Sequence, residues 1–199
     1  MKSTLLLLAA TGLALSAKSQ FAVRPVIGAG YLASVYTPRS STLVNGEKLK
    51  ERTDPGAYAM AGVTFEKGRF YIPALVTYQL NNTYQEHTYP GIRRVDDERR
   101  QQSINLSGGV GLNLNSRLFT YQTSLSPGVT LFTDRASNQS GYEAFPTLTY
   151  DLTAYRKYLG LRFFAAVPLG HATATPAHAN LWNIGIGINF RFLPRSYYL

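Results

Sequence analysis

The sequence predicts an all-β fold, an eight-stranded antiparallel up-and-down barrel that spans a membrane, from three observations. Apolar residues recur at every second position in eight separate stretches, which is the period of a strand and not of a helix. Short and long connections alternate between these stretches. The positions between the apolar ones hold mainly Gly, Ser, Thr, Asn and Gln, which suits a narrow polar lumen better than a water-facing exterior.

The first element, residues 1–19, is predicted to be a secretory signal peptide. Lys2 supplies the positive charge, residues 4–15 form the apolar core, and small residues follow in SAKSQ. The apolar run is too short to cross a bilayer as a helix. Cleavage is expected before Gln20, with cleavage after Ala17 as a second option and a buried first helix as the alternative interpretation. The rest of the chain, residues 20–199, is expected to form one barrel domain.

The first four strands are predicted in residues 21–36, 57–66, 69–81 and 103–114. Their outward faces are expected to be the alternate positions that run from Phe21 to Val35, from Ala57 to Phe65, from Phe70 to Leu80 and from Ile104 to Leu114. Pro25 and Pro73 fall inside these strands. Because proline cannot donate to a strand ladder, each requires a bulge or a missing hydrogen bond.

The last four strands are predicted in residues 117–132, 144–155, 158–170 and 180–192. Their apolar positions run from Phe119 to Leu131, from Leu148 to Ala154, from Leu159 to Leu169 and from Trp182 to Phe192. Three further prolines fall in this half and are expected beyond the membrane, towards the loops: Pro127, Pro146 and Pro168.

The connections predict two unlike ends. Lys67-Gly68, Asn115-Ser116 and Arg156-Lys157 are expected to be tight hairpin turns on the periplasmic side. Residues 38–56, 82–102, 133–143 and 171–179 are expected to be long extracellular loops. The first two of these loops are the best candidates for specificity, because barrels vary function in their loops while the wall stays constant.

A soluble lipocalin-like barrel is the alternative architecture, with the apolar face inward and charged side chains outward. The aromatic residues favour the membrane barrel, because they gather at both ends of the apolar face as interfacial girdles do. They are Phe65, Phe70, Phe119, Tyr121, Phe190 and Phe192 near the turns, and Tyr36, Tyr78 and Trp182 nearer the loops.

Charged residues at inward positions predict a lumenal polar network. Counting back from the tight turns places Asp151 opposite Arg162 and Glu66 opposite Arg69. Arg24 and Arg191, on strands that meet at the closure, are expected to extend the network around Asp151. Eight strands leave room for side chains alone, so no open pore is expected. The network then acts as a self-neutralising plug, with a gate or a proton path as the alternative interpretation.

The closing segment GIGINFRF resembles the last strands of small eight-stranded bacterial outer-membrane proteins, of the OmpX and OmpA transmembrane-domain type. The resemblance covers nearly all of the mature chain and is architectural. It implies location in the outer membrane and a porin-like or outer-membrane β-barrel domain. One departure is the tail LPRSYYL after Phe192, where many such proteins end.

Composition excludes several function classes. There is no cysteine, so a disulfide or a thiolate metal site is impossible. The net charge of +9 does not indicate nucleic-acid binding, because residues 92–100 balance four Arg against three acids and no basic stripe lies on a helix face. His87, His171 and His178 lie in predicted loops without ligand spacing, so neither a metal nor a cofactor is expected.

The leading hypothesis is a non-enzymatic, monomeric barrel that contacts outer-membrane lipids and carries a structural or surface-interaction role in its loops, with no named extracellular partner. The first alternative is a channel for small solutes or hydrophobic substrates. The second is a lipid A-modifying enzyme that uses His171 or His178. Basic residues at the turn end are expected to contact anionic headgroups or periplasmic polymers, or only to anchor the barrel: Lys67, Arg69, Arg117, Arg156, Lys157 and Arg195.

Overall fold

The computed structural model describes residues 21–36, 41–42, 48–89, 92–134, 141–169, 181–193 and 195–197. The predicted signal peptide, residues 38–40 and 43–47 of the predicted first long loop, His171 and His178 lie outside the described residues. No helix among the described residues is both long and apolar enough to cross a membrane.

The described secondary structure consists of strands, and the alternating pattern located each of the predicted ones. The strands are β1 (Phe21–Tyr36), β2 (Ser41–Thr42), β3 (Lys48–Lys67), β4 (Phe70–Tyr89), β5 (Ile92–Gly108), β6 (Val110–Asn115), β7 (Thr120–Asp134), β8 (Gly141–Arg156), β9 (Leu159–Pro168), β10 (Leu181–Arg191) and β11 (Arg195–Tyr197). β5 and β6 are two parts of one wall strand, since both pair with β4 and β7.

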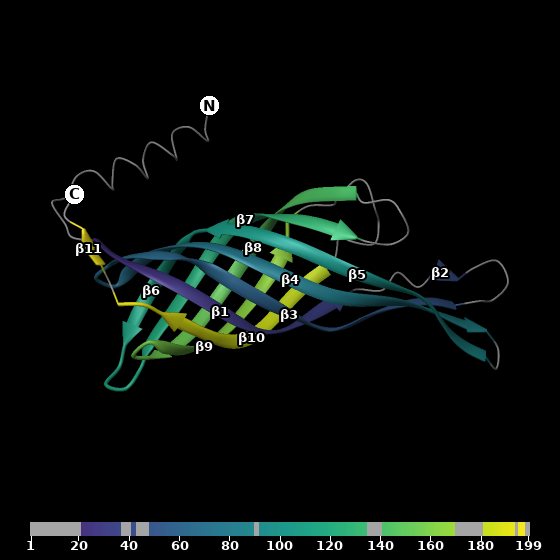
Figure 1. The fold of residues 1–199 in the computed structure, drawn as a ribbon, viewed down its shortest axis with the longest axis horizontal. Coiled ribbons are helices and arrows are strands. Elements are labelled where there is room, and N and C mark those ends of the chain that lie inside the picture. Colours follow the sequence, from purple (N-terminus) through teal and green to yellow (C-terminus); the bar gives the residue numbers. More distant parts are fainter. Residues whose placement is uncertain are drawn as a thin grey trace, which may run out of the picture.

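The sheet closes on itself because β1 has a partner on each side (Figure 1). β1 pairs with β3 from Ala22↔Glu66 to Leu32↔Gly56, and with β10 from Val26↔Arg191 to Tyr36↔Leu181. The other wall strands each pair antiparallel with their neighbours in chain order. The predicted eight-stranded antiparallel barrel is confirmed.

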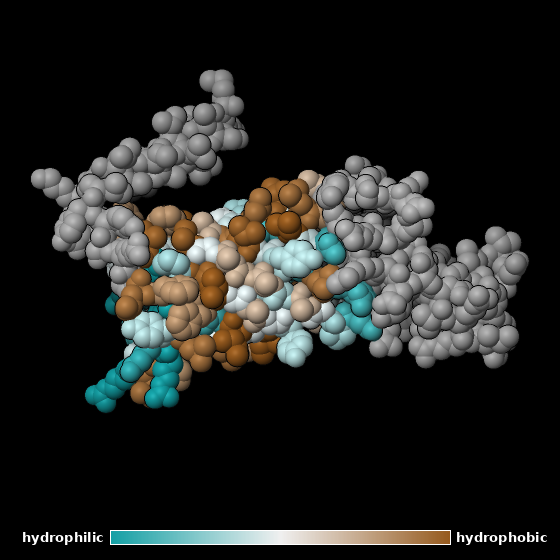
Figure 2. All heavy atoms as spheres, in the orientation of Figure 1, coloured by the Kyte–Doolittle hydropathy of each residue, from teal (hydrophilic) through white to brown (hydrophobic). Residues whose placement is uncertain are grey.

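The wall has an apolar exterior and a tightly packed interior. In β10 the outward Ile184, Ile186 and Ile188 are 48%, 44% and 58% exposed, and the intervening residues are buried. The same alternation holds in the other wall strands, and apolar side chains cover much of the barrel's outer face in Figure 2. A soluble lipocalin-like barrel would show the reverse, so that alternative is wrong.

Two prolines explain two irregularities of the wall. Pro73 faces Gly109, which donates its N–H to the Pro73 carbonyl at 3.2 Å but receives no N–H in return, and there the ladder breaks between β5 and β6. Pro25 faces Phe192, whose N–H donates to the Pro25 carbonyl at 3.0 Å, and β10 ends one residue earlier. Both prolines therefore stay in register at the cost of one ladder bond each.

The predicted turns were each placed slightly too early in the chain. Lys67 pairs with Phe70 around Gly68-Arg69, and Arg156 pairs with Leu159 around Lys157-Tyr158. In both turns the first central residue has a positive φ, +60° at Gly68 and +58° at Lys157, as the first position of a type II′ turn requires. The third connection is longer than predicted and spans residues 116–119, between the paired Asn115 and Thr120.

The predicted long loops 38–56 and 82–102 are in large part strand, which corrects the prediction. β3, β4 and β5 continue past their last wall partners in β1 and β7, and they pair with one another as far as Tyr89↔Ile92. We call residues 48–55, 82–89 and 92–100 the β-extension; it projects to the right in Figure 1. It was missed because residues beyond the wall lack an apolar face and so show no period of two.

The tail after Phe192 also forms a strand. β11 pairs with the start of β1, with Phe21 opposite Tyr197 and Val23 opposite Arg195. The register is shifted by one residue from the β1–β10 pairing, in which Val26 faces Arg191. The residues after the last wall strand therefore extend its pairing with β1 at the turn end, the end that carries the β3–β4, β6–β7 and β8–β9 connections.

Candidate functional site: the lumen

Arg162 is the most deeply buried charged residue at the centre of the lumen. Its side chain is 2% exposed, and its Nε donates to Oδ1 of Asp151, which is 6% exposed. The predicted register was wrong, because Asp151 faces Phe164 and Arg162 faces Thr153. The error moved the pair by two positions, which preserves the face of each side chain, so the two residues still meet diagonally across neighbouring strands.

Two aromatic rings complete the surroundings of Arg162. Its guanidinium carbon lies 4.5 Å from the ring centroid of Phe164 and 5.4 Å from that of Tyr58. The two rings contact each other edge to face, with centroids 4.9 Å apart. The negative faces of the two rings offset part of the desolvation cost of the cation.

Glycines on neighbouring strands provide the space for the inward aromatic rings. Gly185 lies directly opposite Phe164, Gly111 opposite Tyr71 and Gly160 opposite Tyr155. A Cβ at Gly185 would lie 2.0 Å from Phe164 Cε1, and one at Gly111 would lie 2.3 Å from Tyr71 Cε1. Each of these three rings therefore has space on one neighbouring strand, where the facing residue has no side chain.

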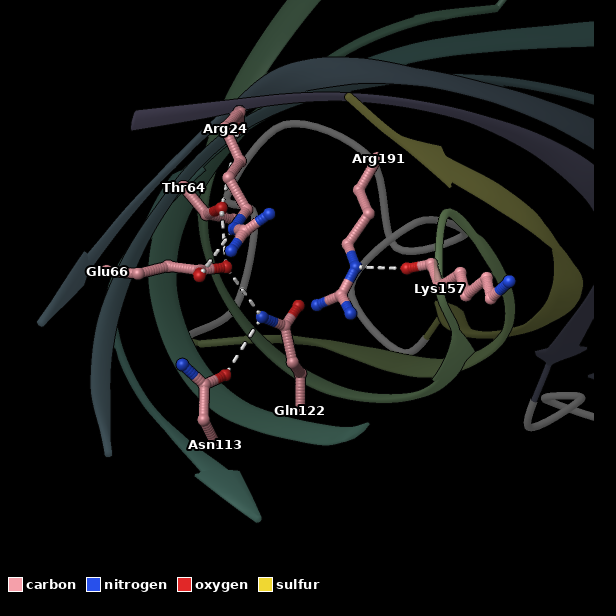
Figure 3. A network of polar contacts seen from close by, with 7 residues as sticks. All are labelled: Arg24, Thr64, Glu66, Asn113, Gln122, Lys157 and Arg191. Carbon is pink, nitrogen blue, oxygen red and sulfur yellow. Dashed lines mark hydrogen bonds and ion pairs between the residues drawn. The ribbon is translucent and has the colours of Figure 1, made fainter. Parts of the chain in front are cut away.

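A second polar cluster closes the turn end of the lumen (Figure 3). Arg24 Nε lies 2.7 Å from Glu66 Oε2, and Gln122 Nε2 bridges Glu66 Oε1 at 3.0 Å and Asn113 Oδ1 at 2.9 Å. Arg69 was predicted to face Glu66, but it lies exposed in the β3–β4 turn, while Glu66 faces Tyr71. The shift of the turn by one residue is the cause.

Arg191 lies at the same end on β10, which pairs with β1, the strand that carries Arg24. Its Nε donates to the Lys157 carbonyl at 2.7 Å, and its guanidinium carbon lies 4.4 Å from the Tyr155 centroid. Arg24 and Arg191 therefore make these contacts at the turn end, away from the predicted contact with Asp151. The charges of the lumen form two groups instead of one.

Uncharged amides and hydroxyls fill the lumen towards the loop end. Asn183 Nδ2 donates to Gln79 Oε1 at 3.0 Å, and Ser103 donates to the same oxygen at 3.1 Å. On the far wall, Asn105 and Thr147 both contact the Thr130 hydroxyl, at 2.8 Å and 2.7 Å. These bonds join neighbouring and facing strands across the interior.

Part of the interior is apolar, which the sequence pattern did not reveal. A buried cluster lies on β1, β3, β4 and β9, opposite the Ser and Thr residues of β7 and β8. Its members are Val26, Leu32, Tyr58, Met60, Leu75, Phe164 and Ala166. The alternation showed which positions point inward, but the lumen is a packed core in which such residues are accepted beside polar ones.

One cavity remains between the two charged groups. It has a volume of about 20 Å³ and is lined by Asp151, Arg162, Tyr71 and Asn189 among others. Asp151 Oδ2 and Asn189 Oδ1 are buried there without a hydrogen-bond partner among the described residues. The volume suits one or two water molecules, which would satisfy these oxygens.

No set of three or more His, Asp or Glu side chains able to hold a metal ion occurs among the described residues. His87 lies on β4 in the β-extension, opposite Arg94 of β5 and Leu49 of β3.

Comparisons with known proteins concern architecture. No protein-family profile matches the sequence, and no curated protein matches it. Among solved structures, the chain is similar to the attachment invasion locus protein Ail of Yersinia pestis, with 11% identity, a TM-score of 0.45, and coverage of 85% of this chain and 98% of Ail. It is also similar to the outer-membrane protein OprG of Pseudomonas aeruginosa, with 14% identity, a TM-score of 0.43, and coverage of 88% of this chain and 98% of OprG. A third similar structure is the translocator domain of the autotransporter NalP of Neisseria meningitidis, with 12% identity, a TM-score of 0.37, and coverage of 96% of this chain and 95% of that domain.

Proposed function

We propose that the protein is an integral outer-membrane barrel whose lumen is plugged and whose role is structural or interactive, carried by the β-extension. The observation that carries the proposal is the outer face of the closed wall, where large apolar side chains stay between about a third and three quarters exposed. In hydrocarbon each backbone group needs a partner, and a closed barrel provides one throughout its wall. Such a face in water would be an aggregation surface.

The height of the apolar face fits a bilayer. Trp182 and Phe192 bound the outward row of β10, and both are exposed, at 51% and 42%. They are ten residues apart, which is about 33 Å along a strand and about 25 Å along the barrel axis at a tilt near 40°. The apolar band of an outer-membrane barrel is about 25 Å tall.

The membrane location is tested by heat-modifiability and fractionation. The protein should run on a denaturing gel at two positions, before and after boiling, and it should be found in the outer-membrane fraction. A single position in both samples, together with recovery in the soluble periplasmic fraction without detergent, contradicts the proposal.

The plugged lumen is supported by the central Arg162–Asp151 pair, the apolar cluster and the small volume of the remaining cavity. In planar lipid bilayers, the purified protein is expected to give no stable conductance steps, with a known porin as the positive control in the same bilayers. Reproducible steps would favour the channel alternative.

We propose that the protein is not an enzyme. Overexpression should leave the mass spectrum of extracted lipid A unchanged. New acylated species that disappear in the His171→Ala or His178→Ala variant would identify a lipid A-modifying enzyme instead.

A further inference from the structure

Within the barrel wall and its turns, the described basic side chains lie mainly at the turn end. The structure describes the side chains of eight Lys and Arg residues, and all of them except the central Arg162 lie at this end. The seven are Arg24, Lys67, Arg69, Arg117, Arg156, Lys157 and Arg191. The first and last of these point into the mouth of the lumen, and the other five are exposed; we call these five the basic belt.

The acids with described side chains do not neutralise the basic belt. Glu66 points into the lumen and binds Arg24, and Asp151 is buried beside Arg162. Asp54 lies far along β3, where that strand leaves the wall and pairs with Asn82. The belt therefore presents a positive field to whatever surrounds the turn end.

The belt extends around much of the barrel. Its members come from the β3–β4 turn, the β6–β7 connection and the β8–β9 turn, which join three successive pairs of neighbouring wall strands. In Figure 2, hydrophilic side chains project beyond the apolar wall at the lower left, where the β6–β7 and β8–β9 connections lie in Figure 1. A globular partner would contact one side of such a belt, whereas a lipid leaflet surrounds all of it.

Exposed aromatic rings lie directly beside the belt. Lys67 Nζ lies 5.4 Å from the centroid of Phe21, and Phe70, next to Arg69, is 68% exposed. Phe119, two residues after Arg117, and Tyr158, next to Lys157, are also exposed. Aromatic residues favour the headgroup level of a bilayer, and long basic side chains reach outward from that level to phosphates.

We propose that the basic belt binds the phosphate headgroups of anionic phospholipids in the periplasmic leaflet. The inference rests on the proposed membrane location and adds a lipid preference to it. Each Lys or Arg near an anionic surface favours association by roughly fivefold, and salt weakens the effect because the side chains are exposed.

The test compares three proteins, each folded into phosphatidylcholine vesicles with and without 30% phosphatidylglycerol. The belt variant carries Lys67→Gln, Arg69→Gln, Arg117→Gln, Arg156→Gln and Lys157→Asn; Asn is chosen at the last position because it tolerates the positive φ. The matched control loses five charges from the β-extension and carries Lys48→Gln, Arg93→Gln, Arg94→Gln, Arg99→Gln and Arg100→Gln.

Two measurements are made on each protein: the thermal midpoint from heat-modifiability, and the ratio of phosphatidylglycerol to phosphatidylcholine that remains bound in native mass spectrometry. In the wild type and the control, phosphatidylglycerol is expected to raise the midpoint and to be enriched at least fivefold among bound lipids. The belt variant should lose both effects, and 0.5 M NaCl should remove the midpoint rise from the wild type.

Equal effects of phosphatidylglycerol on all three proteins, or none on the wild type, would overturn the inference. So would salt-resistant stabilisation of the wild type, a result that needs no variant to fold. Binding of the wild type to peptidoglycan sacculi without a lipid preference would assign the belt to a polymer instead. Failure to give a heat-modifiable barrel in phosphatidylcholine alone would contradict the proposed function and is distinguishable from each of these outcomes.

Discussion

At the scale of single residues, the buried lumen contains an ion pair in which each charge requires the other as its counter-ion. Arg162 is nearly inaccessible to solvent, so its charge is tolerated only because Asp151 accepts from Nε and two rings cover its faces. Burying an ion pair contributes little net stability, whereas removing one member leaves an uncompensated charge. The pair therefore specifies the packing of the lumen more than it adds to its stability.

Replacing one member of this pair should destabilise the barrel more than replacing both. Asp151→Asn is expected to lower the free energy of unfolding by about 3 kcal/mol or more, because Arg162 stays buried without its counter-ion. The double variant Asp151→Asn/Arg162→Met should lose less than either single variant. Urea unfolding in lipid vesicles measures the free energy of unfolding of the two single variants and of the double variant. If the loss in the double variant equals the sum of the two single losses, the two charges do not interact.

Two glycines provide a matched test of whether the glycine that faces an inward aromatic ring is needed to make space for that ring. Gly185→Ala should destabilise the barrel by about 1–3 kcal/mol, because the new Cβ would lie 2.0 Å from a Phe164 ring atom. Gly108→Ala should change stability little, because its nearest contact is the Pro73 carbonyl at 3.6 Å. The same unfolding assay compares the two variants, and similar losses in both would argue against a specific role for the ring.

At the scale of elements, the sequence located the strands well and their ends poorly. Inside the wall, an apolar outward face and a packed lumen impose an alternation that can be read directly from Trp182 to Phe192. Turn register depends on which residue takes a positive φ, and a lysine at that position, Lys157, gives no sequence signal of the kind that Gly68 does.

The candidate site was predictable only in part for the same reason. The charged residues at inward positions could be identified from the sequence, because they stand among uncharged polar residues. A register error of two positions leaves each side chain on the same face of the sheet. Their partners could not be predicted from the sequence. The contact of Arg24 with Glu66 depends on the register of β1 against β3, and this register is determined by the closure of the barrel, not by a local sequence pattern. The Gly185–Phe164 pair likewise becomes apparent only once the strand register is known.

The short strand β11 should protect the start of β1. Deletion of residues 195–199 removes the partners of Phe21, Ala22 and Val23 on that side. Hydrogen exchange of the residue 21–23 amides is expected to accelerate, while exchange in the central part of β1, paired with β10, should stay slow. The deleted protein should still be heat-modifiable; unchanged exchange at residues 21–23 would show that β11 does not hold this segment.

At the scale of the whole molecule, a single tryptophan reports on the orientation of the wall. Trp182 is the one tryptophan of the chain, and its outward side chain is 51% exposed near the loop end. In a bilayer its fluorescence should be quenched most strongly by lipids brominated close to the headgroup, because an indole at the end of the apolar face lies at the interface.

Moving the indole along the same strand gives the matched control. In Trp182→Phe/Ile186→Trp, the new tryptophan lies four residues, or about 13 Å of strand, nearer to the middle of the wall and on the same face. Lipids brominated deep in the acyl chains should now quench best. Equal and weak quenching of both proteins by every brominated lipid would mean that this face does not contact the membrane.

The pairing of β1 with β10 has a consequence for how the chain folds. Val26 pairs with Arg191, so β1, the first wall strand to be synthesised, can form the hydrogen bonds of this edge only after β10 has been synthesised. Contacts between such distant parts of a chain make folding slow, and until they form, the polypeptide carries adhesive strand edges together with its apolar side chains. We therefore expect the exported chain to need a holding factor that keeps it unfolded and apart from its copies, and we expect any truncation before β10 to leave an open sheet without the β1–β10 pairing.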